Sequence, residues 1–377
     1  MFATPRLTSL IPGRVRRWYR DRYPHRAPDY AKLWESDCRK WLIGEIGVEG
    51  GELRVTGWLI APPSLREQIG FQLNGRPVER IEFPLRRPDV GERFSFVPDA
   101  AASGFRLSIP WPDAAVDRGD LTFSVIDQRT KASVGWAYAP IHVPSGARFG
   151  PSPAAEKVAR VIGTSSQLNF RSGGLTAFEA LQHAVHSTLE KPLTDFPRVL
   201  DWGCGCARVS RYFLPLPGVR VHGVDVDADN VQWCRERLPA GEWSVVPLRP
   251  PTQLPEAGFD LAFGISVFTH LKEPEQLVWL NELHRILRPC GVALMTFHGP
   301  ASIVWSGLSA ERFAVLNKYG ICDQANPLYD AQLSERDYYR DTFHTEAYIR
   351  KVWGRFFTIR AILPCAVAHQ DLVVMER

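Results

Sequence analysis

Several features that would place this chain in a specialised class are missing from it. No apolar run in its 377 residues approaches the ~18 residues that a membrane-spanning helix needs. No signal-peptide core follows the first residues, so we expect a cytoplasmic protein. The net charge is only +4, and no basic, aromatic-interleaved groove is evident. We therefore expect no nucleic acid among its partners.

The seven cysteines follow no regular framework. Their odd number in a long chain favours free thiols over disulfides. Cys204 and Cys206 form one C-x-C pair, but a zinc site would need a second pair, and the sequence has none. We predict no metal site.

The chain is too long for one ordinary core, which favours two domains. From 36 to 145 the apolar residues alternate, as at Ile69, Phe71 and Leu73, where the hairpin signal Asn74-Gly75 follows. Turn residues recur about every 8–12 residues, which predicts an all-β sandwich. Through Gly57-Trp58 and the turn 86–90 it resembles the immunoglobulin-like modules found beside enzymes that build surface glycans.

An arginine-rich arm, residues 1–35, precedes this domain. One interpretation is a peripheral contact with an anionic membrane or another acidic partner. The other is a solvated, partly ordered tail. The sequence does not predict an oligomeric state.

A Gly/Pro-rich linker at 144–153 leads into a second domain, residues 150–377. We predict helices that start at Pro153 and after the capping box Thr176–Glu179. Further helices are expected near 207–214, 227–238 and 274–288, and strands at 198–201, 220–225, 243–246, 259–264, 292–297, 356–363 and 371–376. This alternation predicts an α/β fold with a doubly wound, mostly parallel sheet.

The first strand of that sheet ends in "DWGCG", with Asp201 followed by Gly203 and Gly205. Ligands bind beyond the carboxyl ends of such strands, where glycines let the backbone turn tightly and approach a ligand. Asp201 could face an ammonium group. Asp225, at the end of the second strand, could accept both hydroxyls of a ribose.

S-adenosylmethionine has both an amine and a ribose diol, so it suits a site in which Asp201 faces the amine and Asp225 accepts the diol. A dinucleotide would need a third glycine where Arg208 stands, and the acid at the mouth of the loop would repel a pyrophosphate. Two alternatives stay open: a nicotinamide-dependent oxidoreductase, and a non-catalytic binding protein that works through its β-sandwich.

Residues 150–377 resemble a class I S-adenosylmethionine-dependent methyltransferase. The motifs that carry the resemblance are "VLDWGCGCAR" (199–208), "GVDVD" (223–227), "FDLAFGISVFTHL" (259–271) and "LHRILRPCGVALMTFHG" (283–299). The resemblance implies a seven-stranded sheet whose last strand is antiparallel. It implies that Asp201, Gly203 and Gly205 hold the methionine end of the cofactor.

The resemblance also implies that Asp225 takes the ribose, that Val226 packs on the adenine, and that Gly264, Ile265 and Ser266 line the far wall. Phe170 either closes the pocket or packs in the core. No acid follows the third strand, so adenine recognition is expected to use backbone groups or Arg249.

A hydroxyl acceptor would benefit from a general base. His298, just past the fifth strand, is the first candidate, His270 the second and His344 the third. We expect the long aromatic-rich segment 300–345 to cap the acceptor pocket, with a helix from Ser309 to Gly320. The β-sandwich favours a saccharide or lipid-linked glycan as acceptor, and a small metabolite is the alternative.

Overall fold

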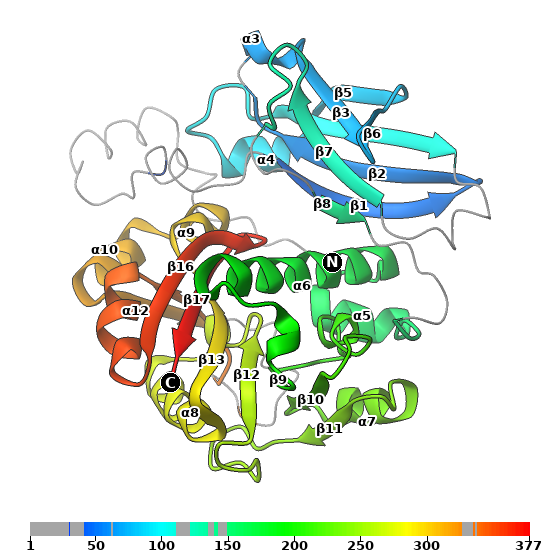
Figure 1. Ribbon diagram of the computed structural model, residues 1–377. Coiled ribbons are helices and arrows are strands. Elements are labelled where there is room, and N and C mark those ends of the chain that lie inside the picture. Colours follow the sequence, from blue (N-terminus) through cyan, green and yellow to red (C-terminus); the bar gives the residue numbers. More distant parts are fainter. Residues whose placement is uncertain are drawn as a thin grey trace.

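The computed structural model describes residues 30, 41–61, 63–110, 121–134, 139–141, 149–325, 335 and 338–377. Apart from Tyr30, the basic arm lies outside the described residues, as does the first half of the linker. A part built mainly of β-strands lies over one end of a larger part that contains both helices and strands (Figure 1). The boundaries 36–145 and 150–377 stay predictions.

The N-terminal part contains two four-stranded antiparallel sheets. The strand order of the first sheet is β1 (Trp41–Glu49), β2 (Glu52–Leu59), β6 (Ala102–Pro110) and β5 (Ile81–Arg86). The strand order of the second sheet is β4 (Arg76–Pro77), β3 (Ile69–Leu73), β7 (Leu121–Asp127) and β8 (Ala139–Ile141). Two short helices, α3 (Pro63–Arg66) and α4 (Pro88–Arg93), accompany them. Val55 and Leu107 of one sheet share a core with Phe71 and Phe123 of the other. The immunoglobulin-like relationship stays a prediction.

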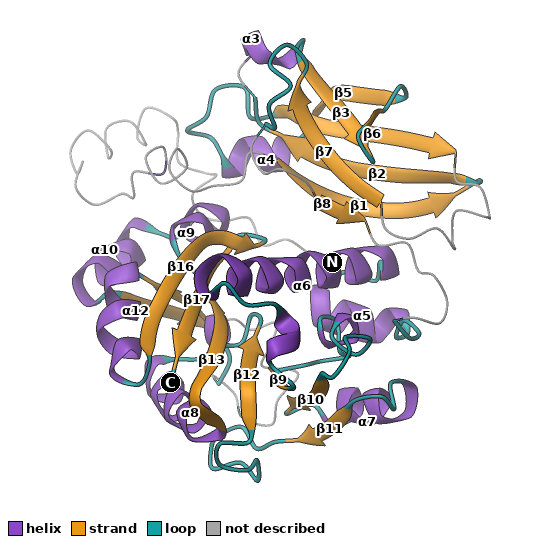
Figure 2. Cartoon of the chain, in the orientation of Figure 1, coloured by secondary structure: helices purple, strands orange, loops and turns teal. Residues whose placement is uncertain are grey.

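The C-terminal part is built on a seven-stranded sheet with helices on both faces (Figure 2). Its order is β11 (Glu242–Val245), β10 (Arg220–Asp225), β9 (Arg198–Trp202), β12 (Phe259–Gly264), β13 (Leu287–Phe297), β17 (Gln370–Glu376) and β16 (Thr358–Val367). The pairs from β11 to β13 are parallel, and β17 is antiparallel to both of its neighbours. The predicted doubly wound sheet with an antiparallel last strand is therefore confirmed.

The α-helices within the described residues of this part are α5 (Ala155–Ile162), α6 (Gln167–Leu189), α7 (Ala228–Arg237), α8 (Glu273–Ile286), α9 (Pro300–Ser306), α10 (Ala310–Tyr319) and α12 (Glu346–Val352). A small pair of strands, β14 (Ile321–Ala325) and β15 (Arg340–His344), follows α10. As predicted, Ser309 caps α10, and Gly320 ends it in the left-handed conformation.

Two predicted helix starts are wrong. The side chain of Ser166 caps α6, so Thr176 lies inside that helix, where its hydroxyl donates a hydrogen bond to the Ser172 carbonyl at 2.9 Å. No helix begins at 207, because Ala207 has a left-handed φ of 54° and only a short 3-10 turn, Ser210–Tyr212, follows.

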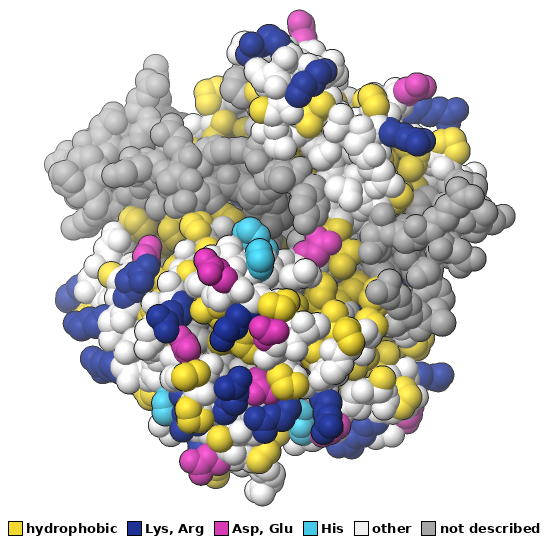
Figure 3. Space-filling view, in the orientation of Figure 1, with side chains coloured by type: hydrophobic (Ala, Val, Ile, Leu, Met, Phe, Trp, Pro, Cys, Tyr) yellow, Lys and Arg dark blue, Asp and Glu magenta, His cyan; other side chains and the backbone are white. Residues whose placement is uncertain are grey.

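The two parts of the chain meet along β1 and α6. Asn169 accepts a hydrogen bond from the Ile46 amide and donates one to the Gly44 carbonyl, each at 2.9 Å. The Ser166 hydroxyl donates to the Ile46 carbonyl at 3.1 Å. On the face shown in Figure 3, basic and acidic side chains are interspersed over the C-terminal part, so this face presents no large patch of one sign.

Candidate functional site

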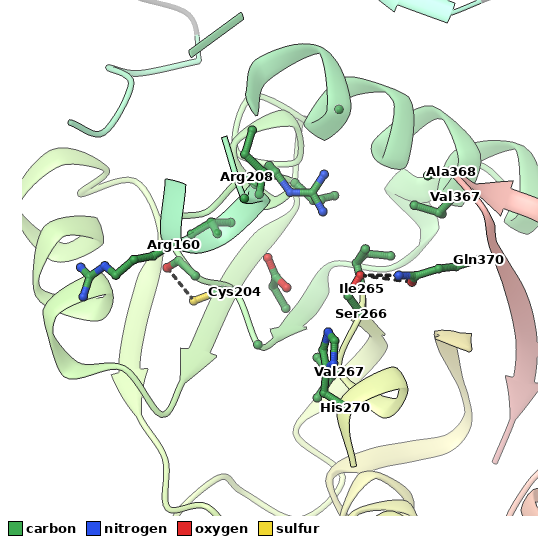
Figure 4. Close-up of a pocket in the computed structure, with 18 of the residues that line it drawn as sticks. Arg160, Cys204, Arg208, Ile265, Ser266, Val267, His270, Val367, Ala368 and Gln370 are labelled. Carbon is green, nitrogen blue, oxygen red and sulfur yellow. Dashed lines mark hydrogen bonds between the residues drawn. The ribbon is translucent and has the colours of Figure 1, made fainter. Parts of the chain in front are cut away.

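A cavity of about 950 Å³ lies at the carboxyl ends of β9, β10 and β12. Its walls also include residues of helices α5 and α6, of the turn between β16 and β17, and of strands β1 and β8 of the N-terminal part. Figure 4 shows some of the lining residues. Its volume is near the upper end of the usual range for small-molecule sites. The cavity is therefore large enough for two ligands side by side.

The glycine-rich loop after β9 is fastened to β10. The amides of Gly203 and Cys204 both donate to the Val224 carbonyl, at 2.8 and 3.0 Å. Gly203 has a φ of 78°, and a Cβ there would lie 2.6 Å from Val267 Cγ2. Only glycine fits this position, because both the backbone conformation and the space exclude a side chain.

Asp225 ends β10 and lines the cavity. Its Oδ2 accepts a hydrogen bond from the Gly205 amide at 2.7 Å, and its Oδ1 accepts one from the Asp227 amide at 2.9 Å. Burial raises the pKa of Asp225 above its usual value, and these backbone bonds offset part of that effect. Each oxygen keeps a lone pair that could accept a ligand hydroxyl.

Asp201 is the penultimate residue of β9, where it is only 4% exposed and lines the same cavity. The Ser210 hydroxyl donates a hydrogen bond to its carboxyl group. Burial raises the pKa of Asp201 to about 7, and the negative charge of Asp225 adds to this effect. A cationic ligand group placed here would favour the ionised form.

The cavity wall on the side of β11 is mostly apolar. Val226, Val246 and Leu248 line it, together with Trp279, whose indole nitrogen donates to the Leu248 carbonyl at 3.1 Å. Arg249 does not line the cavity, because its guanidinium pairs with Glu275 at 2.9 Å and with Glu335 at 2.6 Å. Of the two alternatives for adenine recognition, backbone groups or Arg249, the structure therefore disfavours Arg249.

The wall beyond β12 is made by Ile265 and Ser266 rather than by Gly264. A Cβ on Gly264 would lie 2.9 Å from Met295 Sδ and 3.0 Å from Trp202 Cε3, so this glycine permits close packing behind the wall. The side chain of Ser266 is held by Gln370, whose amide nitrogen donates to its hydroxyl at 2.8 Å.

Phe170 is fully buried and does not line the cavity. It packs with Val158 and Cys206, and the guanidinium of Arg211 lies 5.1 Å from its ring centre. Of the two interpretations of Phe170, the structure favours core packing over closure of the pocket.

Both His270 and His298 line the cavity, with ring centres 6.3 Å apart. His270 Nδ1 lies 3.1 Å from the Arg340 carbonyl and 3.8 Å from Asp341 Oδ1. His298 Nδ1 is buried and has no hydrogen-bond partner among the described residues. Burial lowers the pKa of both rings, and for His298 the neighbouring histidines lower it further. Both are therefore neutral at pH 7 and could accept a proton.

His344 is a neighbour of His298, to whose carbonyl its amide donates at 2.9 Å, but it does not line the cavity. It is fully buried behind the cavity wall, with Nε2 3.0 Å from Gln276 Oε1, and burial lowers its pKa to about 3. It therefore packs in the interior and does not reach the site.

Several groups of lining residues were not predicted from the sequence, among them the following two. His369, in the turn between β16 and β17, stacks on His298 at 5.9 Å between ring centres. The antiparallel last strand brings this turn to the ligand edge of the sheet, so the predicted closing hairpin could have indicated it. The other group comes from the N-terminal part: Trp41, Leu42, Ile43, Ile46, Ala139 and Pro140. No sequence signal indicated how the two parts meet.

Within the described part of the chain, no helix is long and apolar enough to cross a membrane. The same residues contain no cluster of three or more His, Cys, Asp or Glu side chains that could hold a metal ion.

Residues 199–291 match the family described as "Methyltransferase domain". The chain is 38% identical over 102 residues to trans-aconitate 2-methyltransferase of Azoarcus sp. (strain BH72), a match that covers 27% of this chain and 39% of that protein. It is 37% identical over 95 residues to the protein of the same name from Rhodopseudomonas palustris (strain BisB18), covering 23% and 35%. The chain thus spans less than half the length of these curated relatives.

The chain therefore carries an S-adenosylmethionine-dependent methyltransferase domain with a Rossmann-like fold. The cofactor of this domain is S-adenosylmethionine, as the two strand-end acids predicted, and the match favours it over the nicotinamide alternative.

Solved structures are also similar to the chain. One is the 1,6-didemethyltoxoflavin-N1-methyltransferase of Burkholderia thailandensis with bound 1,6-didemethyltoxoflavin and S-adenosylhomocysteine, at 19% identity and a TM-score of 0.38, covering 63% of this chain and 95% of that one. Another is the PH0226 protein of Pyrococcus horikoshii OT3, at 20% identity and a TM-score of 0.37, covering 54% and 90%.

Proposed function

We propose that the protein transfers a methyl group from S-adenosylmethionine to a hydroxyl or another heteroatom of a small-molecule acceptor. The observation that carries this proposal is one cavity lined by two strand-end carboxylates, Asp201 and Asp225, and by two histidines that are neutral at pH 7. When bound, the cofactor supplies an electrophilic methyl group. The protein positions the acceptor, excludes water and removes a proton.

The cavity residues fit the cofactor. Asp225 keeps unused acceptor capacity for the ribose hydroxyls, and Val226 offers an apolar surface for the adenine. Gly203 and Gly205 leave space above the loop for the methionine end, and Asp201 can face its ammonium group. Ile265 and Ser266 bound the same end from the opposite wall.

Of the two histidines, His270 is the better supported base. Its Nδ1 faces the Arg340 carbonyl and Asp341, which orient the ring and would stabilise a positive charge on it. Figure 4 shows the His270 ring directed toward the middle of the cavity. His298 Nδ1 has no hydrogen-bond partner among the described residues, the ring has only a backbone hydrogen bond with Thr342, and a proton on it would be repelled by three neighbouring histidines. The sequence had placed His298 first.

The acceptor end of the cavity combines histidines with an apolar wall from β1, formed by Leu42 and Ile43. This wall supports an acceptor with an apolar portion beside its methylated heteroatom. The saccharide or lipid-linked glycan expected from the sequence stays a candidate. Trans-aconitate, which the names of the curated relatives mention, is a second acceptor to test.

Calorimetric titration with S-adenosylmethionine and with NAD tests the cofactor, and the variant Asp225→Ala tests the site. The variant should bind S-adenosylmethionine about 1.5–3 kcal/mol more weakly, the usual contribution of hydrogen bonds to a charged group. Glu236→Ala, which removes an exposed acid of α7 outside the cavity, should bind normally. Equal affinity of Asp225→Ala and the wild type would contradict the assignment. Release of S-adenosylhomocysteine in the presence of glycans, small alcohols or trans-aconitate then identifies the acceptor.

A further inference from the structure

Arg208 is a cation in the cavity wall without a matching anion. It follows the glycine-rich loop, and its side chain lines the cavity. Its guanidinium makes no hydrogen bond or ion pair with any residue in the described part of the chain. Burial lowers the pKa of Arg208, whereas the charge of Asp201 favours its protonated form. A guanidinium in such surroundings is costly unless a ligand supplies the missing acceptor oxygens.

Two glycines in the N-terminal half of α6, Gly173 and Gly174, lie against this arginine and the loop that carries it. Glycine inside a helix costs about 1 kcal/mol relative to alanine, so Gly173 and Gly174 need a packing reason. A Cβ on Gly174 would lie 2.1 Å from the Arg208 carbonyl oxygen, and one on Gly173 would lie 3.4 Å from Arg208 Nη1. Gly174 therefore lets the loop backbone lie directly against the helix, whereas a Cβ on Gly173 would touch the guanidinium only at ordinary van der Waals distance.

The loop therefore presents two opposite charges to one cavity. Asp201 lies at the start of the loop, and Arg208 extends from its end toward the side on which Ile265 and Val367 lie (Figure 4). No ion pair joins Asp201 to Arg208, so each remains available to a ligand. The other arginine in the described wall, Arg160, is already paired with Asp227 and Asp229.

The methionine end of S-adenosylmethionine carries an ammonium group and a carboxylate. We propose that Arg208 binds this carboxylate while Asp201 faces the ammonium group. The inference rests on the proposed function, because it takes the cofactor as given. A guanidinium can donate two parallel hydrogen bonds to a carboxylate, whereas a lysine ammonium offers only a point charge.

Decarboxylated S-adenosylmethionine is the probe, because it differs from the cofactor only in the missing carboxylate. By calorimetry the wild type should bind S-adenosylmethionine about tenfold to a hundredfold more tightly than the decarboxylated form, as expected of charged hydrogen bonds. In Arg208→Met the two ligands should bind within about threefold of each other, since the group that distinguishes them is gone. Arg208→Lys should retain part of the preference.

Arg220→Met is the matched control. Arg220 is exposed at the start of β10, away from the ligand edge, so the same loss of charge there should leave the preference intact. Binding of the decarboxylated ligand by Arg208→Met shows that the variant is folded. Should it fail to fold, the Arg208→Lys series decides, and an undiminished preference there would overturn the proposal.

The role of Arg208 would be overturned if the wild type bound both ligands equally, or if Arg208→Met kept the full preference for S-adenosylmethionine. Neither result would affect the assignment of the cofactor. A wild type that binds neither ligand would instead overturn the cofactor assignment and this inference with it.

Discussion

Folding and cofactor binding have opposite effects on Asp201: folding favours its protonated form, whereas a bound ammonium group would favour its ionised form. Burial raises its pKa to about 7 in the folded protein, above the value near 4 of an exposed aspartate. The folded state therefore binds this proton more tightly than the unfolded chain does. Asp201 consequently lowers the free energy of unfolding progressively as the pH rises from about 4 to about 7. A bound ammonium group would offset that cost.

We therefore predict that the affinity for S-adenosylmethionine rises up to about tenfold between pH 6 and pH 8, because the ionised fraction of a group with a pKa near 7 rises by about that factor. Calorimetry at the two pH values measures the change. In Asp201→Asn the affinity should be lower and nearly independent of pH. If the variant kept the wild-type pH dependence, another group would be responsible for it.

The two histidines give a second prediction at this scale. His270→Gln should lower turnover about 10²–10⁴-fold, the usual contribution of a positioned base, whereas His298→Gln should lower it much less. Because burial lowers the pKa of His270, the wild-type rate should fall only below about pH 6.5, and His270→Gln should lose this limb. Steady-state rates against pH, with the acceptor that the screen identifies, measure both effects. If His298→Gln lowered turnover more than His270→Gln did, His298 would be the base instead.

At the scale of secondary-structure elements, α6 is the helix that connects the site to the N-terminal part. Ser166 caps it by accepting a hydrogen bond from the Asn169 amide at 3.2 Å, and it also donates to Ile46 of β1. The cavity lies against the same end of α6, where Asn169, Gly173 and Thr176 line it. One hydroxyl therefore stabilises both the helix start and the junction with β1.

We predict that Ser166→Ala lowers the free energy of unfolding by about 1–2 kcal/mol, the range for loss of a helix cap. Thr176→Ala, at the position where the sequence had predicted the cap, should change stability by less than about 0.5 kcal/mol, because alanine is a better helix former inside α6. Chemical denaturation of the two variants measures the difference. A loss below about 0.5 kcal/mol in Ser166→Ala would mean that the Ser166 cap adds little to stability.

The sequence predicted best those elements for which its pattern has only one interpretation. Strands such as 259–264 are short apolar runs, and their registers follow from the parallel sheet. The capping box at Thr176 was misleading, because a Ser-initiated helix ten residues earlier passes through it. Asp201, Gly203 and Asp225 could be placed at the ligand edge because strand ends define that edge. Phe170 could not be placed, since an aromatic residue on a helix packs equally well in a core or against a ligand.

At the scale of the whole molecule, the acceptor end of the cavity depends on both parts of the chain. Trp305 of α9 stacks on Trp58 of β2, with ring centres 6.0 Å apart, and on His369 at 5.4 Å and an interplanar angle of 11°. The guanidinium of Arg93 lies 4.5 Å from the same indole ring. His369 in turn stacks on His298 in the cavity wall. A continuous aromatic stack thus runs from the N-terminal part to the candidate acceptor site.

The final prediction tests whether this stack positions the acceptor side. Trp305→Ala should lower kcat/KM for the acceptor at least about tenfold, because His369 and His298 lose the ring that fixes them. The affinity for S-adenosylmethionine should stay within about threefold, since Asp201 and Asp225 lie at the other side of the cavity. Trp305→Phe, which keeps an aromatic face, should behave nearly as the wild type. A folded Trp305→Ala protein with normal kcat/KM would show that the N-terminal part covers the site without organising it.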